Sequence, residues 1–219
     1  MNFSDLKKLD KIYLCAGENF YSKWEEYKVK TKLNWVGIWY HMDTDLKTQN
    51  LGLINDNNPA NLYNIKHDLT KKHDLDDNSV DIYQSEDVFE HIEYDELLPA
   101  INDIYRILKP NGLFRLSIPD YNQKLITDRC LKKNGVIYFD PNGGGEYKDG
   151  KVINGGHVWF PTIDLVKDLL EKSSFKKINY LQYWDNNIPH HSQIDYSLGY
   201  IKRTPKFSKK HSIVVDCYK

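Results

Sequence analysis

The chain has little of what defines several large protein classes. Its 219 residues contain only three cysteines, Cys15, Cys130 and Cys217. They are far apart and odd in number, which gives neither a metal motif nor a disulfide framework, so we expect a reduced, cytoplasmic protein. No apolar run approaches the roughly 18 residues that a membrane helix needs. Residues 1–10 also lack the apolar stretch of a secretory signal.

The chain also lacks an excess of charge of either sign. Lysine and arginine number 30 against 31 aspartate and glutamate, for a formal net charge of −1. A general nucleic-acid binder carries a large basic excess, so we expect no nucleic-acid partner. With 40% hydrophobic and 28% charged residues, the composition is that of a globular protein, and the length favours a single domain over residues 1–219.

No glycine-rich dinucleotide motif (G-x-G-x-x-G) and no P-loop occurs, which excludes two common classes of nucleotide-binding protein. Predicted strands and helices alternate instead, as in an α/β domain with a mostly parallel sheet. We expect strands over residues 11–14, 36–42, 62–65, 80–84, 113–118, 177–183 and 211–218. The last two follow each other without a helix, which predicts an antiparallel pair.

Two helices are predicted between these strands. One has apolar residues at helical spacing from Leu97 to Leu108 and ends before Pro110 and Gly112. The other begins after Thr162, which is a suitable N-cap. Between the two helices, beyond the strand at 113–118, residues 121–158 are rich in glycine and weak in apolar periodicity. They predict a long loop that shapes a binding site.

Ligands of open α/β sheets bind outside the carboxyl ends of the strands. Gly17 follows the first predicted strand, where it allows the backbone to approach a ligand. Asp43, or its neighbour Asp45, ends the second strand, where a carboxylate accepts hydrogen bonds from a ribose diol. Asp68 follows the third strand, where it would meet an exocyclic amine of a purine. Each residue alone reads equally well as part of a turn, a surface or a cap.

Four motifs occur together in one order. They are H-D-L at 67–69, D-N-S-V-D-I-Y at 77–83, S-E-D-V-F-E-H-I at 85–92 and R-I-L-K-P-N-G-L-F-R-L-S-I-P-D at 106–120. Their sequence and spacing resemble the class I S-adenosylmethionine-dependent methyltransferases, and segments at 157–166, 171–175 and 212–219 extend the likeness. Within that family the chain looks most like the small methyltransferases of glycan and polysaccharide biosynthesis.

The resemblance implies a Rossmann-like, seven-stranded, mostly parallel sheet with an antiparallel last strand and helices on both faces. It implies S-adenosylmethionine as the cofactor. The implied contacts are the backbone of Cys15, Ala16, Gly17 and Glu18, then Asp43 on the ribose, Asp68 and Leu69 near adenine, and Ser85 and Glu86. The family usually has glycine where Cys15 stands, and a Cβ there would crowd the methionine end of the cofactor.

Methyl transfer from a sulfonium is an in-line displacement, so the enzyme mainly orients the acceptor and excludes water. A hydroxyl acceptor benefits from a general base, for which His157, Asp120 and His91 are the candidates. Trp159 and Tyr121 are the candidate substrate contacts. Each of these residues also reads as a purely structural one. No third ligand accompanies the His190–His191 pair, so we expect no metal site.

The expected function is O-methylation of a sugar hydroxyl in a glycan or sugar intermediate. The aromatic content, 16 tyrosines and 5 tryptophans, fits a sugar-binding surface, although a tyrosine-rich core explains it as well. A methyltransferase for another small metabolite or for a protein is an alternative, because acceptor pockets in this fold are built from variable loops. A non-catalytic binding or scaffold domain is a second alternative, motivated by Cys15. The oligomeric state is not indicated.

Overall fold

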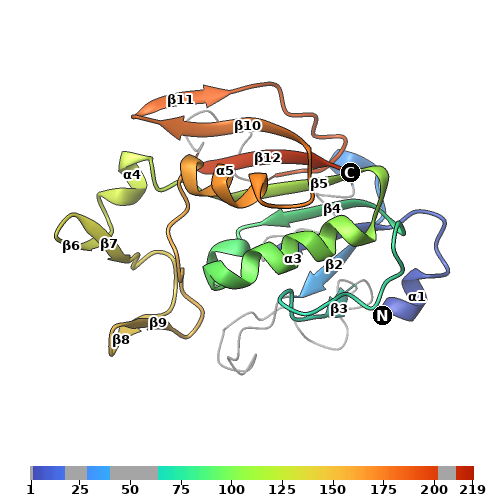
Figure 1. Ribbon diagram of the computed structural model, residues 1–219, viewed down its shortest axis with the longest axis horizontal. Helices are drawn as coiled ribbons and strands as arrows, with labels where there is room; N and C mark the ends of the chain where they lie inside the picture. Colours follow the sequence, from blue (N-terminus) through green and yellow to red (C-terminus); the bar gives the residue numbers. More distant parts are fainter. Residues whose placement is uncertain (1, 18–28, 40–63, 202–210) are drawn as a thin grey trace.

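The computed structural model describes residues 2–17, 29–39, 64–201 and 211–219, and within them an eight-stranded sheet forms the centre of the molecule (Figure 1). The strand order is β11-β10-β12-β5-β4-β1-β2-β3. Their bounds are β1 Tyr13–Gly17, β2 Trp35–Trp39, β3 Asn64–Lys66, β4 Val80–Glu86, β5 Leu108–Pro119, β10 Lys177–Asp185, β11 Ile188–His191 and β12 Ser212–Tyr218.

The strand directions confirm the predicted Rossmann-like sheet. Neighbours pair in parallel from β3 to β5, whereas β12 runs antiparallel to both β5 and β10. The antiparallel pair expected near the end of the chain is therefore β10 with β12. The expected count of seven strands was one short, because the four residues of β11 fold back onto β10 through the tight turn at Asn186 and Asn187.

Two helices of the described residues, α3 Tyr94–Ile107 and α5 Ile163–Glu171, lie side by side on one face of the sheet (Figure 1). Both match the predicted helices. The buried face of α3 carries Leu97, Ile101 and Ile104, and the Thr162 hydroxyl accepts a hydrogen bond from the Leu165 amide as the N-cap of α5. Shorter helical segments are α1 Phe3–Leu6, η2 Phe89–His91 and α4 Lys124–Thr127. No helix among the described residues has the length and apolar character to cross a membrane.

The opposite face of the sheet is covered, in the described residues, by the segment that follows β11. Tyr200 packs there with Cys15, Trp35 and Ile82 in a second apolar cluster. The fully buried guanidinium of Arg115 holds this segment by donating to the carbonyls of Asp195 and Gly199 at 2.8 and 2.7 Å. Helical residues also reach this face, since the Thr31 hydroxyl accepts a hydrogen bond from the Trp35 indole N–H at 2.8 Å.

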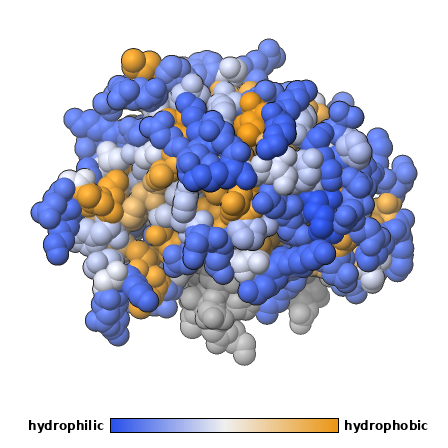
Figure 2. All heavy atoms as spheres, viewed as in Figure 1, coloured by the Kyte–Doolittle hydropathy of each residue, from blue (hydrophilic) through white to orange (hydrophobic). Residues whose placement is uncertain are grey.

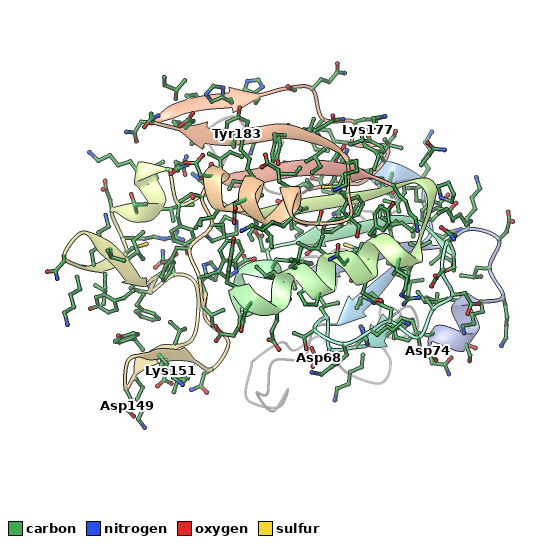
Figure 3. All side chains as sticks on the ribbon, viewed as in Figure 1. Asp68, Asp74, Asp149, Lys151, Lys177 and Tyr183 are labelled. Atoms are coloured by element: carbon green, nitrogen blue, oxygen red, sulfur yellow. The ribbon has the colours of Figure 1, made fainter. Side chains whose placement is uncertain are left out.

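Residues 121–158 contain regular structure, contrary to the predicted loop. Besides α4 they form two hairpins, β6 Leu131–Lys133 with β7 Val136–Phe139, and β8 Glu146–Lys148 with β9 Lys151–Ile153. The hairpins project from the carboxyl ends of the parallel strands, with Asp149 and Lys151 far from the sheet (Figures 1 and 3). Strands of only three or four residues, joined by positive-φ turns at Asn134 and Asp149, are too short to show a clear period, which explains the difference from the prediction.

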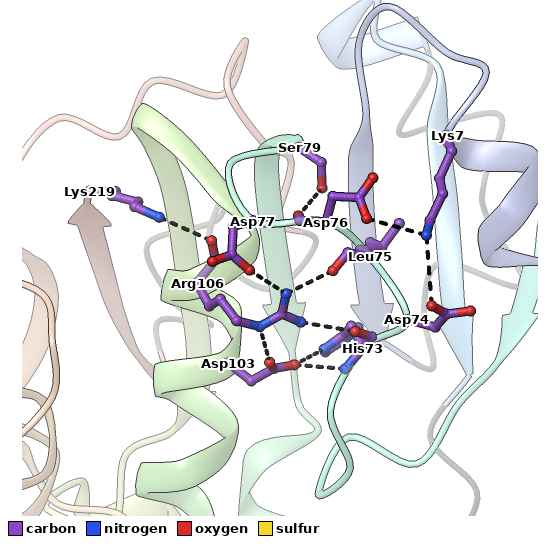
Figure 4. A network of polar contacts seen from close by, with 10 residues as sticks. All are labelled: Lys7, His73, Asp74, Leu75, Asp76, Asp77, Ser79, Asp103, Arg106 and Lys219. Atoms are coloured by element: carbon purple, nitrogen blue, oxygen red, sulfur yellow. Dashed lines mark hydrogen bonds and ion pairs between the residues drawn. The ribbon is translucent and has the colours of Figure 1, made fainter.

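A polar network ties α3 to the strand connections at the other end of the sheet (Figure 4). Arg106 donates to the carboxylates of Asp103 and Asp77 and to the carbonyls of His73 and Leu75. Burial alone would raise the pKa of Asp103, but hydrogen bonds from His73 and Arg106 lower it to about 2.

The face that carries α3 and α5 is mainly hydrophilic, with scattered apolar side chains (Figure 2).

Replacing Arg115 by methionine should lower the free energy of unfolding by about 3–5 kcal/mol, because the carboxylate of Asp216 would stay buried without its cation. Urea denaturation measures the change. The control is Lys148→Met on the exposed β8, which should shift stability by less than about 0.5 kcal/mol. A loss below 1 kcal/mol in the Arg115 variant would contradict the assigned role.

Candidate active site

The strand order reverses between β1 and β4. From β1 the sheet extends to β2 and β3 on one side and to β4 and β5 on the other. Such a switch point leaves a crevice outside the carboxyl ends, where ligands of α/β proteins bind. Gly17 and Glu86 are paired at the last position of these strands. A Cβ on Gly17 would lie 3.0 Å from the Glu86 carbonyl oxygen, so a side chain there would require the two strands to shift by a few tenths of an ångström.

The side chain of Cys15 points away from this crevice. Side chains of a strand alternate between faces, so Ala16 joins the main core while Cys15 packs in the second cluster beside Trp35. Burial raises the pKa of the Cys15 thiol, and the charge of Glu86 adds to the effect. The expectation that a Cβ at this position crowds the space beyond the strand is therefore corrected: its surroundings are apolar core.

Ser85 and Glu86 are the last two residues of β4 and are completely buried. The sequence placed them just after the strand, but β4 continues two residues further than predicted. Their backbone consequently forms one wall of the crevice at the switch point.

The predicted adenine contacts follow β3. Asp68 uses Oδ1 to accept hydrogen bonds from the amide and the hydroxyl of Thr70, at 2.9 and 2.8 Å, so it caps a turn (Figure 3). Leu69 is 1% exposed and its side chain belongs to the core. Glu18, Asp43 and Asp45 lie outside the described residues.

Three side chains converge beyond the ends of β4 and β5. Glu90 and His91 belong to η2, directly after β4, and His157 closes the 121–158 segment. Nε2 of His157 lies 3.7 Å and Nε2 of His91 lies 4.0 Å from Glu90 Oε1. Glu90 is completely buried and His157 is 8% exposed. The Val158 amide donates to the Glu90 carbonyl at 2.9 Å, which fixes the segment on η2.

A hydrogen-bonded chain orients His157. Its Nδ1 contacts the hydroxyl of Tyr121, which donates to Asp140 Oδ2 at 2.8 Å, and Arg129 donates to both oxygens of Asp140. Burial opposes ionisation of Asp140, but the hydrogen bonds from Arg129 and Tyr121 prevail and lower its pKa. Burial and the neighbouring Asp140 raise the pKa of Tyr121, so its hydroxyl keeps its proton.

The glycines before His157 serve its packing. A Cβ on Gly143 would lie 2.7 Å from the His157 ring, and a Cβ on Gly156 would lie 2.4 Å from the Gly144 carbonyl oxygen. The two backbone stretches approach too closely for side chains, and this approach seats the imidazole beside Glu90.

Asp120 is also completely buried, at the end of β5. Its carboxylate accepts hydrogen bonds from the amides of Asn122 and Trp184, so it joins the turn after β5 to β10. Its role as a general base stays a prediction, but both oxygens already have backbone partners.

Trp159 is 8% exposed and packs in the main core against Tyr94. Its indole N–H donates to the Phe89 carbonyl at 2.9 Å. A residue that stacks against a sugar needs an open ring face. The described contacts of this ring are instead those of a core residue, which packs against η2 and donates a hydrogen bond to it.

The structure thus brings together three of the predicted site residues, His91, His157 and Tyr121. Sequence reasoning did not single out Glu90, Asp140 or Arg129. Glu90 had a signal, since it directly precedes His91 in the V-F-E-H segment. Asp140 and Arg129 lie in the segment taken as a loop, where no periodic pattern marks them.

Comparison with known proteins bears on the fold. Residues 32–116 match a family model described as a methyltransferase domain. A search of curated proteins gave no significant match.

Solved structures share the fold. A SAM-dependent methyltransferase from Archaeoglobus fulgidus superposes with a TM-score of 0.57 at 11% identity, over 96% of this chain and 87% of that one. A SAM-dependent methyltransferase from Methanosarcina mazei gives 0.54 at 13% identity, over 100% and 98%. The 1,6-didemethyltoxoflavin-N1-methyltransferase of Burkholderia thailandensis, solved with S-adenosylhomocysteine, gives 0.52 at 11% identity, over 95% and 71%. The chain therefore has the Rossmann-like fold of class I SAM-dependent methyltransferases.

Asp120 should make stability fall as the pH rises. Burial raises its pKa from 3.8 to about 6, so the folded state favours the protonated carboxyl. The stabilisation is complete below pH 4 and is lost as the pH rises through 6. Relative to Asp120→Asn, the wild type should lose on the order of 2–3 kcal/mol of unfolding free energy between pH 4 and 7. Urea denaturation across this range measures it. The control Asp128→Asn changes an exposed residue and keeps Asp120, so its curve should run parallel to that of the wild type. A curve for Asp120→Asn that also runs parallel to the wild type would contradict the assignment.

Proposed function

We propose that the protein is an S-adenosylmethionine-dependent methyltransferase that methylates a hydroxyl of a sugar or glycan intermediate. The observation that carries the proposal is the cluster of Glu90, His91 and His157, of which Glu90 and His157 are buried, beyond the carboxyl end of β4. The methyltransferase-domain match and the neighbours solved with S-adenosylhomocysteine support the cofactor.

The cofactor would lie across the switch point. The close approach of Gly17 to Glu86 leaves backbone groups, rather than side chains, at the strand ends. We assign the methionine end to the backbone of residues 15–18, the ribose to Asp43 and the adenine to the turn at Asp68 and Leu69. The end of β4, at Ser85 and Glu86, forms the wall between the cofactor and the acceptor.

In the reaction, an acceptor oxygen forms a bond to the methyl carbon while the bond from that carbon to sulfur breaks. The acceptor hydroxyl gives up its proton, which needs a base nearby. In the absence of a bound metal ion, we assign the role of general base to Nε2 of His157, because Nδ1 is engaged with Tyr121. The ionised Asp140 beyond Tyr121 favours the imidazolium that results. Asp120 ranks behind His157, since its oxygens accept two amide hydrogen bonds.

Another small-molecule acceptor is the second candidate. The Burkholderia neighbour is named as a methyltransferase of a small heterocycle and methylates nitrogen. The buried position of Trp159 removes one argument for a sugar surface, so a heterocyclic acceptor belongs in any substrate panel.

Cofactor binding is the first test. The wild type should bind S-adenosylhomocysteine in isothermal titration calorimetry, and Gly17→Ala should weaken binding at least tenfold, since the new Cβ separates β1 from β4. The control, Gly135→Ala at the β6–β7 turn, has no neighbouring atom within 4 Å and should bind normally. Absence of binding by the wild type would refute the proposed activity.

Methyl transfer is the second test. With methyl-labelled cofactor and a panel of sugars, nucleotide sugars and heterocyclic amines, label should appear on a sugar oxygen. His157→Ala should lower kcat by at least 100-fold, in the range of a lost general base, with cofactor affinity unchanged. Label only on nitrogen would favour the second candidate. Cofactor binding without any transfer would favour the non-catalytic alternative.

A further inference from the structure

Glu90, His91 and His157 present two imidazole nitrogens and one carboxylate whose ligand atoms lie within 4.8 Å of one another. We propose that these three residues bind a divalent transition-metal ion, with Zn²⁺ as the representative ion, and leave its remaining positions open to water or substrate. The proposal departs from the expectation of no metal site. It concerns metal binding itself and does not depend on methyl transfer.

The spacing suits one ion after a small contraction. At zinc–nitrogen distances of about 2.0–2.1 Å, neighbouring ligand atoms of a tetrahedral site lie about 3.3 Å apart. The distances from Glu90 Oε1 to the two Nε2 atoms, 3.7 and 4.0 Å, are slightly longer. Two histidines and a glutamate form a known catalytic zinc set, and two imidazoles favour a transition metal over Mg²⁺ or Ca²⁺.

The hydrogen bonds of the two rings fix the tautomers that a metal needs. Nδ1 of His91 lies 3.1 Å from the Gly156 carbonyl oxygen, which only accepts, so Nδ1 carries the proton. The Tyr121 hydroxyl donates its hydrogen bond to Asp140, so Nδ1 of His157 must donate to the Tyr121 oxygen. Both neutral rings therefore present the Nε2 lone pair on the side of Glu90.

The partners behind the ligands resemble those of established metal sites. A metal-bound histidine usually donates its other N–H to a carbonyl or a carboxylate, which orients the ring and raises its basicity. Here the Gly156 carbonyl accepts a hydrogen bond from His91 directly, and the Asp140 carboxylate is linked to His157 through the Tyr121 hydroxyl. Arg129 in turn holds Asp140 in place.

The burial of Glu90 points the same way. A carboxylate is costly to bury unless it meets positive charge, and Glu90 is completely buried. A divalent ion between the three groups would place positive charge directly beside this carboxylate. An acceptor oxygen or water bound to the ion would also lose its proton more readily. With the ion present, His157 would therefore be a metal ligand, and the ion rather than His157 would promote the loss of that proton.

The test is metal binding by the intact protein without cofactor. After treatment with a chelator, the wild type should take up one Zn²⁺ per chain in calorimetry, with a rise in melting temperature. Added Co²⁺ should give the visible absorption of a histidine-ligated ion. Glu90→Gln and His157→Asn should each weaken binding at least 100-fold. Tyr121→Phe, which keeps all three ligands, should weaken it tenfold to 100-fold.

Circular dichroism first establishes that each variant is folded. If Glu90→Gln or His157→Asn does not fold, the Zn²⁺ affinity of Tyr121→Phe tests the proposal. The matched control is the double variant His190→Ala/His191→Ala on the exposed strand β11, which should bind Zn²⁺ as the wild type does. Loss of the bound ion in this control would overturn the proposal. So would a wild type that binds no Zn²⁺, or binding that stays unchanged in Glu90→Gln and Tyr121→Phe.

Discussion

A buried ion pair between Arg115 of β5 and Asp216 of β12 underlies the arrangement of the whole sheet. The guanidinium donates to both carboxylate oxygens at 2.7 Å and to two carbonyls of the segment after β11. The same cation therefore links β12 to β5, against which it runs antiparallel, and holds the segment that covers the second face of the sheet. Because four N–H donors of fixed geometry are engaged together, the strand register and the position of the covering segment are set jointly.

The carboxyl edge depends on a second set of constraints, which all act on the 121–158 segment. Asp120 fixes its beginning against β10, and the Val158 amide fixes its end on η2. Between these points the chain makes two hairpins and returns, and glycines without room for a Cβ let it pass close to itself. The length of the insertion thus places one imidazole beside two residues that lie 66 and 67 positions earlier in the chain.

Local patterns were sufficient for the elements that have a buried stripe. Helix α3, the Thr162 cap and the last strands were predictable, because the signal for each lies in the types and spacing of a few neighbouring residues. The site was predictable only in part. His91, His157 and Tyr121 were named for their chemistry, but no sequence spacing states that Tyr121 reaches His157 or that Glu90 faces both rings. Trp159 shows the converse, since its residue type suggested a substrate contact where packing directs the side chain into the core.

The added strand β11 has a consequence for association between molecules. An outermost strand exposes unpaired backbone groups to which another chain can add, and all four residues of β11 are exposed, with Ile188 at 60%. The strand is only four residues long and contains Pro189, which has no amide hydrogen to donate. A short, proline-interrupted strand therefore ends the sheet in a form that discourages further strand addition and protects this border against aggregation.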